Sequence, residues 1–226
     1  MFPLHDTIPS RRFPLVNWLI IIANVLVFLY ESMLGPVGVA RFTNTWGLVP
    51  LRLLAHTGKA WPTVFSAMFL HGGWFHLLSN MWTLYIFGDN VEGRMGHGRY
   101  LVFYLLSGVA AALLQVFILP FSRVPMIGAS GAIAGVLGAY MILFPQSRVV
   151  TLLPIFFFFT FVEIPAVFYL GFWFLSQVYS GLFSLAGASG SGVAWWAHIG
   201  GFVFGMLAVG VFARPQRPRY YVEYPW

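Results

Sequence analysis

The chain alternates between long apolar stretches and short segments rich in Arg, Pro and Gly. A helix of about 20 apolar residues is long enough to cross the hydrocarbon core of a bilayer. The pattern predicts six such helices, at about 16–34, 72–88, 100–119, 130–144, 164–184 and 193–212. Residues 35–69 form the first loop, whose tryptophans and leucines predict that it folds against the membrane. The most polar stretch, 89–99, separates the second and third helices.

The region 152–185 carries one charge, Glu163, and is too long for one spanning helix but too short for two. Proline is favoured in the first helical turn, where a carboxylate also meets the positive end of the helix dipole. We therefore begin the fifth helix at Ile164, with Glu163 in a capping role. Residues 152–162 then form an interfacial segment, whose Phe and β-branched residues are typical of extended chain.

The composition restricts the class of protein. Charged residues make up 8% of the chain, against about 25% in soluble domains, so a water-facing globular fold is excluded. Aromatic residues at 19% exclude a disordered chain. The absence of cysteine excludes disulfides, thiolate catalysis and Cys-ligated metals. The class of protein that remains is a polytopic membrane protein, with the lipid bilayer as its surroundings. Although the net charge is +6, no basic cluster of the kind that binds nucleic acid is present.

The basic residues give an orientation. Loops on the cytoplasmic side of a membrane protein carry an excess of Lys and Arg. With six spans both termini share one side, and that side holds eight of the 12 basic residues, which predicts that both termini are cytoplasmic. The expected organisation is a cytoplasmic N-terminal segment (1–15), a six-helix domain (16–213) and a cytoplasmic basic tail (214–226). The eight residues are Arg11, Arg12, Arg94, Arg99, Arg148, Arg214, Arg217 and Arg219, and the other four are Arg41, Arg52, Lys59 and Arg123.

The second, fourth and sixth helices all start at the outer side, and their starts carry unusual polar residues. Ser130 lies in the sequence GASG at the start of the fourth helix. It could be an N-cap residue. However, a helix from 130 to 144 is shorter than the hydrocarbon core, so its start should lie below the membrane surface. A non-helical chain at that depth must be buried or line a wet cavity, which makes Ser130 a candidate nucleophile.

His198 lies near the start of the sixth helix. It could be a buried histidine with one satisfied hydrogen bond, but ionisable residues inside a membrane are costly and are functional candidates. A small-residue face follows each candidate, Gly131 to Gly135 after Ser130 and Gly201 to Gly205 after His198. Such faces let two helices approach closely, which would bring the imidazole beside the hydroxyl.

His76 and Asn80 are four residues apart and share one face of the second helix. They could join helices as a polar pair. Alternatively, they could donate to a developing negative charge together with the backbone N–H of Ser130, as an oxyanion hole. His71 ends the preceding loop and is interpreted as structural or as a loop anchor.

The motifs HGGWFHLLSN, GASG and AHIGG, in that order, resemble those of the rhomboid family of intramembrane serine proteases, over about 61–212. The resemblance implies an all-α membrane protein, a six-transmembrane-helix bundle that cleaves transmembrane helices of single-span or polytopic substrates without a cofactor or metal. Ser130 would be the nucleophile and His198 the general base of a dyad, with His76 and Asn80 stabilising the oxyanion. Some members have an aromatic residue under the catalytic histidine, where this chain has Ala134.

Three alternatives remain open at this point. A catalytically inactive relative would bind transmembrane helices without cutting them; its expected mark is loss of Ser or His, and both are present. A metalloprotease could use His71, His76 and His198, but the sequence H-E-x-x-H is absent. A transporter would be indicated by inverted repeats or paired broken helices, which the sequence does not show.

Overall fold

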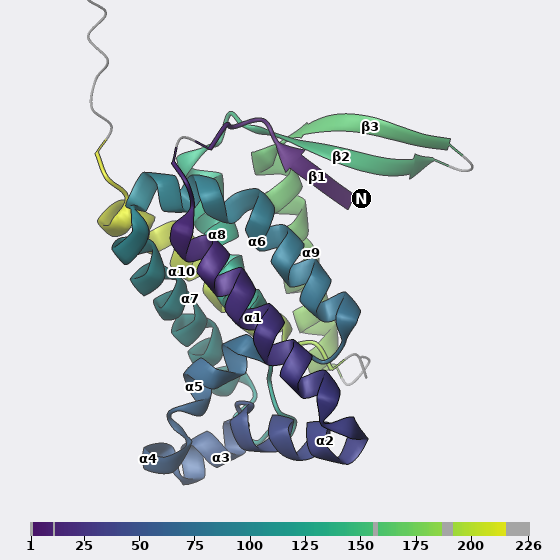
Figure 1. Ribbon diagram of the computed structural model, residues 1–226, viewed down its shortest axis with the longest axis vertical. Coiled ribbons are helices and arrows are strands. Elements are labelled where there is room, and N and C mark those ends of the chain that lie inside the picture. Colours follow the sequence, from purple (N-terminus) through teal and green to yellow (C-terminus); the bar gives the residue numbers. More distant parts are fainter. Residues whose placement is uncertain (1, 11, 156–157, 187–191, 216–226) are drawn as a thin grey trace, which may run out of the picture.

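The computed structural model describes residues 2–10, 12–155, 158–186 and 192–215. A bundle of long helices carries short helices at one end and a three-stranded sheet at the other (Figure 1). In chain order the elements are β1 (Phe2–Asp6), α1 (Leu15–Met33), α2 (Gly35–Trp46), α3 (Pro50–Ala55), α4 (Thr57–Ala60), α5 (Thr63–Ser66), the 3₁₀ turn η1 (Ala67–Phe69), α6 (Trp74–Met95), α7 (His97–Ile118), α8 (Ser130–Leu143), β2 (Arg148–Ile155), β3 (Phe158–Pro165), α9 (Ala166–Leu185) and α10 (Trp195–Phe212).

The long helices lie where the sequence predicts them, with starts that differ by at most three residues. Four of them, α1, α7, α9 and α10, are long and apolar enough to cross a membrane. Helix α8 is apolar but has only 14 residues. Helix α6 has 22 residues and includes polar ones in its last turns. That α6 and α8 also cross the membrane stays a prediction.

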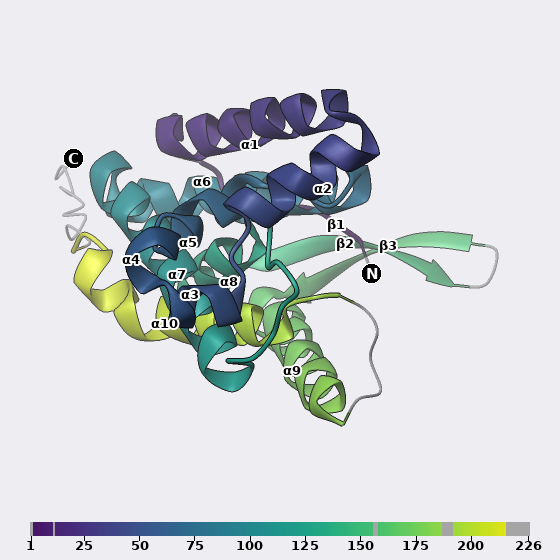
Figure 2. The ribbon, with the colours of Figure 1, turned by 90° about the horizontal axis from the view of Figure 1, so that it is seen from below.

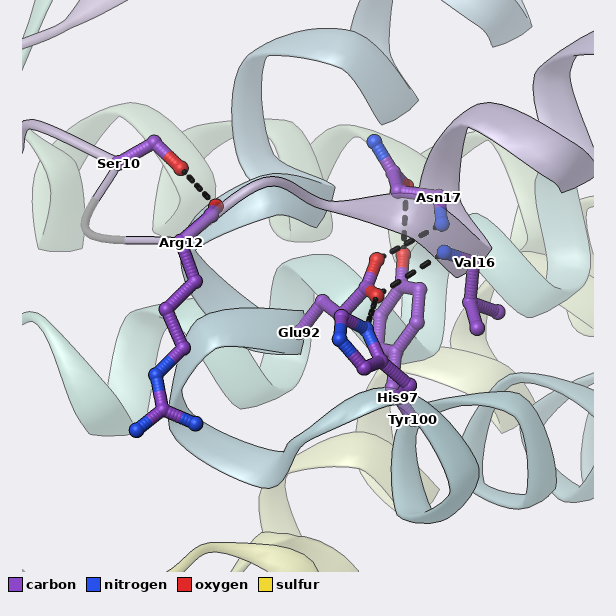
Figure 3. Close-up of polar contacts among 7 residues, drawn as sticks. All are labelled: Ser10, Arg12, Val16, Asn17, Glu92, His97 and Tyr100. Carbon is purple, nitrogen blue, oxygen red and sulfur yellow. Dashed lines mark hydrogen bonds and ion pairs between the residues drawn. The ribbon is translucent and has the colours of Figure 1, made fainter.

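The second predicted helix ends too early, because α6 continues through the polar stretch to Met95. Tertiary partners satisfy its polar side chains. The buried Glu92 carboxylate accepts hydrogen bonds from the backbone N–H groups of Val16 (3.0 Å) and Asn17 (2.7 Å) and pairs with His97 at 2.5 Å, as Figure 3 shows. The first amides of a helix lack intrahelical partners, so Glu92 of α6 caps α1. The Tyr100 hydroxyl donates to the Asn17 side chain (2.7 Å), which ties α7 to the same junction.

The fold is mostly helical, as predicted, but it also contains a three-stranded sheet that an all-α class leaves out. Strands β1, β2 and β3 form one antiparallel sheet in that order. The described residues of the predicted interfacial segment, 152–155 and 158–162, are extended, as its composition indicated, and lie within β2 and β3; residues 156–157 lie outside the described residues. Glu163 does not start the fifth helix: it lies in β3 opposite Val150, and the ladder runs on to Pro165 before α9 begins. Pairing with β2 satisfies the backbone there, so these residues remain extended.

The predicted N-terminal segment is part of the fold. Strand β1 pairs with β2, and Phe2 stacks on Trp82 of α6 with ring centroids 5.8 Å apart. The Trp82 indole N–H donates to the carbonyl oxygen of Pro3 (2.7 Å). Asp6 accepts hydrogen bonds from the Tyr140 hydroxyl and from the side chain of Asn90 (2.9 Å). Burial raises the pKa of the Asp6 carboxyl, an effect that these hydrogen bonds only partly offset.

The first loop is folded into α2, α3, α4, α5 and η1 at the end of the bundle opposite the sheet (Figure 1). Its buried Leu48, Val64 and Ala67 pack in one cluster with Ala112 and Val116 of α7. Leu48 also pairs with Met126 of the segment that leads to α8 through two backbone hydrogen bonds. The loop therefore helps to fix the start of α8.

The basic residues separate between the two ends. Five of the eight that were assigned to the cytoplasmic side are described, and all belong to segments near the sheet end: Arg12, Arg94, Arg99, Arg148 and Arg214. Arg41, Arg52 and Lys59 lie on helices of the opposite end. Arg11, Arg217 and Arg219, with the basic tail from 216 on, lie outside the described residues.

Candidate functional site

Ser130 is the first residue of α8, and its side chain does not cap the helix. The N-cap residue is Ala129, so the capping interpretation of Ser130 is wrong. The chain turns into the helix at Gly128, whose φ of +120° is rarely accessible to residues with a side chain. The Gly128 N–H donates to the carbonyl oxygen of Ala67 (2.8 Å), which anchors the turn to η1. The hydroxyl of Ser130 is thereby left available for a tertiary partner.

That partner is His198 of α10, whose Nε2 lies 2.8 Å from Ser130 Oγ. The glycine faces predicted from the sequence do meet. A Cβ on Gly201 would overlap the carbonyl oxygen of Gly131, and one on Gly205 would overlap that of Gly135. Only glycine permits this approach between α8 and α10, which lie next to each other in Figure 2. The side chains of Ser130 and His198 are both half-buried.

His76 of α6 lies beside the same site. Its Nδ1 accepts a hydrogen bond from the Gly72 N–H (3.3 Å), which leaves the hydrogen on Nε2. A Cβ built on Gly128 would lie 2.7 Å from His76 Nε2 and 3.7 Å from Ser130 Oγ, so Gly128 is the residue between the two side chains. Asn80 is buried one turn further along and donates to the carbonyl oxygen of His76 (2.8 Å). A second amide hydrogen of Asn80 remains for another acceptor.

The backbone of His71 anchors the loop, whereas its ring nitrogens are buried without a hydrogen-bond partner among the described residues. Its backbone N–H donates to the buried carboxylate of Glu31 in α1 (3.1 Å), and its ring lies edge-on to His76 at 5.0 Å. Within the described part of the chain, no three His, Asp or Glu side chains gather as a metal-ligand set. Sequence reasoning also missed Glu31, although a single charged residue within an apolar helix is a signal of a buried polar contact.

Two neighbouring cavities lie between Ser130 and the start of α10. A cavity of about 20 Å³ touches Ser130 and Gly131, which is room for roughly one water molecule. Met126 and Ala194 line this cavity and also line a larger one of about 330 Å³ at the start of α10. The two cavities therefore adjoin each other beside the hydroxyl.

Sequence reasoning missed one polar residue of the site, Gln177 of α9. Its side-chain oxygen lies 2.8 Å from His198 Nδ1, on the side of the ring opposite Ser130. Trp173, one turn earlier on α9, packs on the imidazole with ring centroids 5.9 Å apart. A glutamine in an apolar stretch has no motif around it, and its only signal was its polarity.

The Rhomboid domain sequence model matches residues 58–215, which is more than half of the chain. The chain belongs to the rhomboid family. It is 35% identical to Rhomboid-like protein 11, chloroplastic, of Arabidopsis thaliana over 127 residues, 56% of this chain and 41% of that protein. It is 30% identical to Rhomboid protease GluP of Bacillus subtilis over 207 residues, 90% of this chain and 36% of that protein. The chain thus spans less than half the length of these two relatives.

The family and the apolar helices together indicate an integral membrane protein. Ser130, His198, His76 and Asn80 all fall inside the rhomboid match, as does Gln177. Strand β1 and helices α1, α2 and α3 precede the match.

Proposed function

We propose that this rhomboid is an active intramembrane serine endopeptidase, with Ser130 as nucleophile and His198 as general base. The observation that supports the proposal is the 2.8 Å contact between Ser130 Oγ and His198 Nε2, made by two helices that touch through glycines. A nucleophile within hydrogen-bond reach of a base, with the base held by a third group, is the arrangement that activates a serine hydroxyl.

The reaction follows from this geometry. His198 Nε2 takes the proton of Ser130, and Ser130 Oγ attacks the scissile carbonyl carbon. The oxyanion accepts hydrogen bonds from His76 Nε2–H, from the Asn80 amide and from the Ser130 N–H, which as a first-turn amide has no obligatory helical partner. His198 then protonates the leaving amine, and a water molecule hydrolyses the acyl-enzyme. The two adjoining cavities of about 20 Å³ and 330 Å³ beside Ser130 are a route by which that water could reach the hydroxyl.

The proposed substrates are transmembrane helices of single-span or polytopic proteins. An intact helix hides its carbonyl groups in hydrogen bonds, so the scissile segment must unwind before attack. A cavity of about 430 Å³ lies between α6 and α9 and is lined mainly by apolar and aromatic residues, including Phe75, Leu78, Tyr169 and Trp173. This cavity favours lateral access between α6 and α9. In Figure 2, α9 lies at the edge of the bundle.

The proposed topology has six spans with both termini in the cytoplasm. The sheet end is then the cytoplasmic end. Eight of the 12 basic residues in the sequence are assigned to that side and four to the other, and cytoplasmic segments carry the excess. The first loop and the two cavities beside Ser130 face the opposite side. The proposed boundaries remain 1–15, 16–213 and 214–226, with β1 as a structured part of the first segment.

The test is cleavage of a labelled transmembrane substrate by purified protein in liposomes. Ser130→Ala and His198→Ala should each abolish cleavage while the thermal unfolding midpoint stays near that of the unmodified protein. Cleavage at the unmodified rate by Ser130→Ala would rule out the nucleophile assignment. A folded, unmodified protein that binds the substrate and never cuts it would instead identify an inactive member.

A further inference from the structure

Gln177 occupies the position next to His198 that an orienting group would need. Its side-chain oxygen is 2.8 Å from His198 Nδ1, while Ser130 Oγ is 2.8 Å from His198 Nε2. Both ring nitrogens are therefore engaged, by residues from two different helices. Resting on the proposed function, we propose that Gln177 is a positioning residue, which fixes the tautomer and the orientation of His198.

The amide of Gln177 can lie in only one sense. Its Nε2 donates to the carbonyl oxygen of Trp173 (3.1 Å) and to Ser176 Oγ (2.8 Å). Ser176 Oγ in turn donates to the same carbonyl oxygen (2.6 Å), so its own hydrogen is already used. If the amide were inverted, its oxygen would face a carbonyl oxygen, which has no hydrogen to give. The hydrogen-bond network therefore assigns Oε1 to the imidazole.

This orientation decides the tautomer of the histidine. The side-chain oxygen of Gln177 can only accept, so Nδ1 must carry the hydrogen of the neutral ring. Nε2 is then left with a lone pair toward Ser130, as a general base requires. With the opposite tautomer, Nε2 would donate to the serine oxygen and could not take its proton. Gln177 thus selects the reactive form of His198.

The same face of α9 also holds the plane of the ring. Trp173 lies one turn before Gln177 and packs on the imidazole at 5.9 Å with an interplanar angle of 34°. Trp195 meets the ring edge-on at 6.1 Å. Residue 134, where some rhomboids have an aromatic residue under the histidine, is a buried alanine here. The support that Ala134 cannot provide comes instead from α9.

The test compares Gln177→Leu with Gln177→Glu. Leucine removes the acceptor and leaves a buried N–H without a partner, so kcat should fall about 10- to 100-fold with KM little changed. Glutamate keeps an oxygen toward His198 Nδ1. Its second oxygen can accept from the Ser176 hydroxyl once that hydroxyl turns away from the Trp173 carbonyl oxygen, so most of kcat should remain. A merely structural role predicts the reverse order, because leucine suits an apolar interior and an added carboxylate does not. Ser184→Ala, which removes a hydrogen bond within α9, is the matched control and should keep the unmodified kcat.

A second measurement does not depend on cleavage. In protein labelled with ¹⁵N-histidine, the His198 resonances, assigned with His198→Ala, should report a hydrogen on Nδ1. In Gln177→Leu they should report a mixture of tautomers. An unchanged tautomer and unchanged kcat in Gln177→Leu would overturn the positioning role while Ser130→Ala still abolishes cleavage. If Ser130→Ala cleaves normally, the proposed function fails, even where the tautomer depends on Gln177.

Discussion

Replacing Gly201 by alanine tests whether the contact between α8 and α10 creates the active geometry. A Cβ at residue 201 would come about 1 Å closer to a neighbouring atom than the 3.0 Å minimum that real Cβ atoms keep. The atom that it meets is the backbone carbonyl oxygen of Gly131, which no side-chain rotation can move away. Helix α10 must therefore retreat from α8 by about 1 Å at this point.

The consequence for the dyad follows from the position of the two glycines. Gly131 follows Ser130 directly, and Gly201 lies one turn after His198 on the same helix. A retreat of about 1 Å would lengthen the 2.8 Å contact between Ser130 Oγ and His198 Nε2 beyond hydrogen-bond range. A misplacement of that size costs about 100-fold in rate. Overpacking of the interior should also cost about 1–3 kcal/mol of stability.

The assay is cleavage of a transmembrane substrate in liposomes, with kcat and KM measured separately and the thermal unfolding midpoint recorded. Gly210→Ala on the same helix is the matched control, because a Cβ there meets nothing within 4 Å. Gly201→Ala should lose about 100-fold in kcat, and Gly210→Ala should lose almost none. Full activity in Gly201→Ala, or an equal loss in Gly210→Ala, would refute the link between the glycine contact and the dyad.

Three further predictions concern neighbouring groups. Gly128→Ala should lower kcat by about 10-fold or more, because its Cβ would lie 2.7 Å from the His76 ring at a φ that disfavours side chains; normal kinetics would contradict this. Asn80→Ala should lower kcat by about 10²–10³ and change KM less, whereas a change in KM alone would exclude the oxyanion role. Burial raises the pKa of Asp6 above its unfolded value, so the folded state binds the proton more tightly and stability should fall as pH rises through that range. The thermal unfolding midpoint should therefore fall less steeply with rising pH in Asp6→Asn than in the unmodified protein. An equal slope in the two proteins would exclude Asp6 as the cause.

The positions of the helices and of the candidate dyad could be predicted because their signals are local. Apolar runs of sufficient length mark helices, and a serine or histidine among small residues stands out against them. The glycines after Ser130 and His198 indicated the helix contact that the structure shows. Each of these signals lies within a few residues of the feature that it predicts.

What the sequence did not reveal depends on contacts between distant residues. Helix α6 continues past Gly88 because the N-terminus of α1 uses Glu92 as its cap. Strand β1 forms because β2, about 145 residues away, supplies its backbone partners. Gln177 has no motif around it, and only the packing of α9 against α10 shows that it meets His198. No local pattern encodes such pairings.

The central claim is that Ser130 is a nucleophile activated by His198, and covalent labelling tests it most directly. The protein in liposomes would be treated with a fluorophosphonate, and the modified residue identified by mass spectrometry of peptides. The account predicts a single adduct on Ser130, greatly slowed in His198→Ala and absent in Ser130→Ala. An adduct on another serine, or labelling of Ser130 that does not depend on His198, would contradict it.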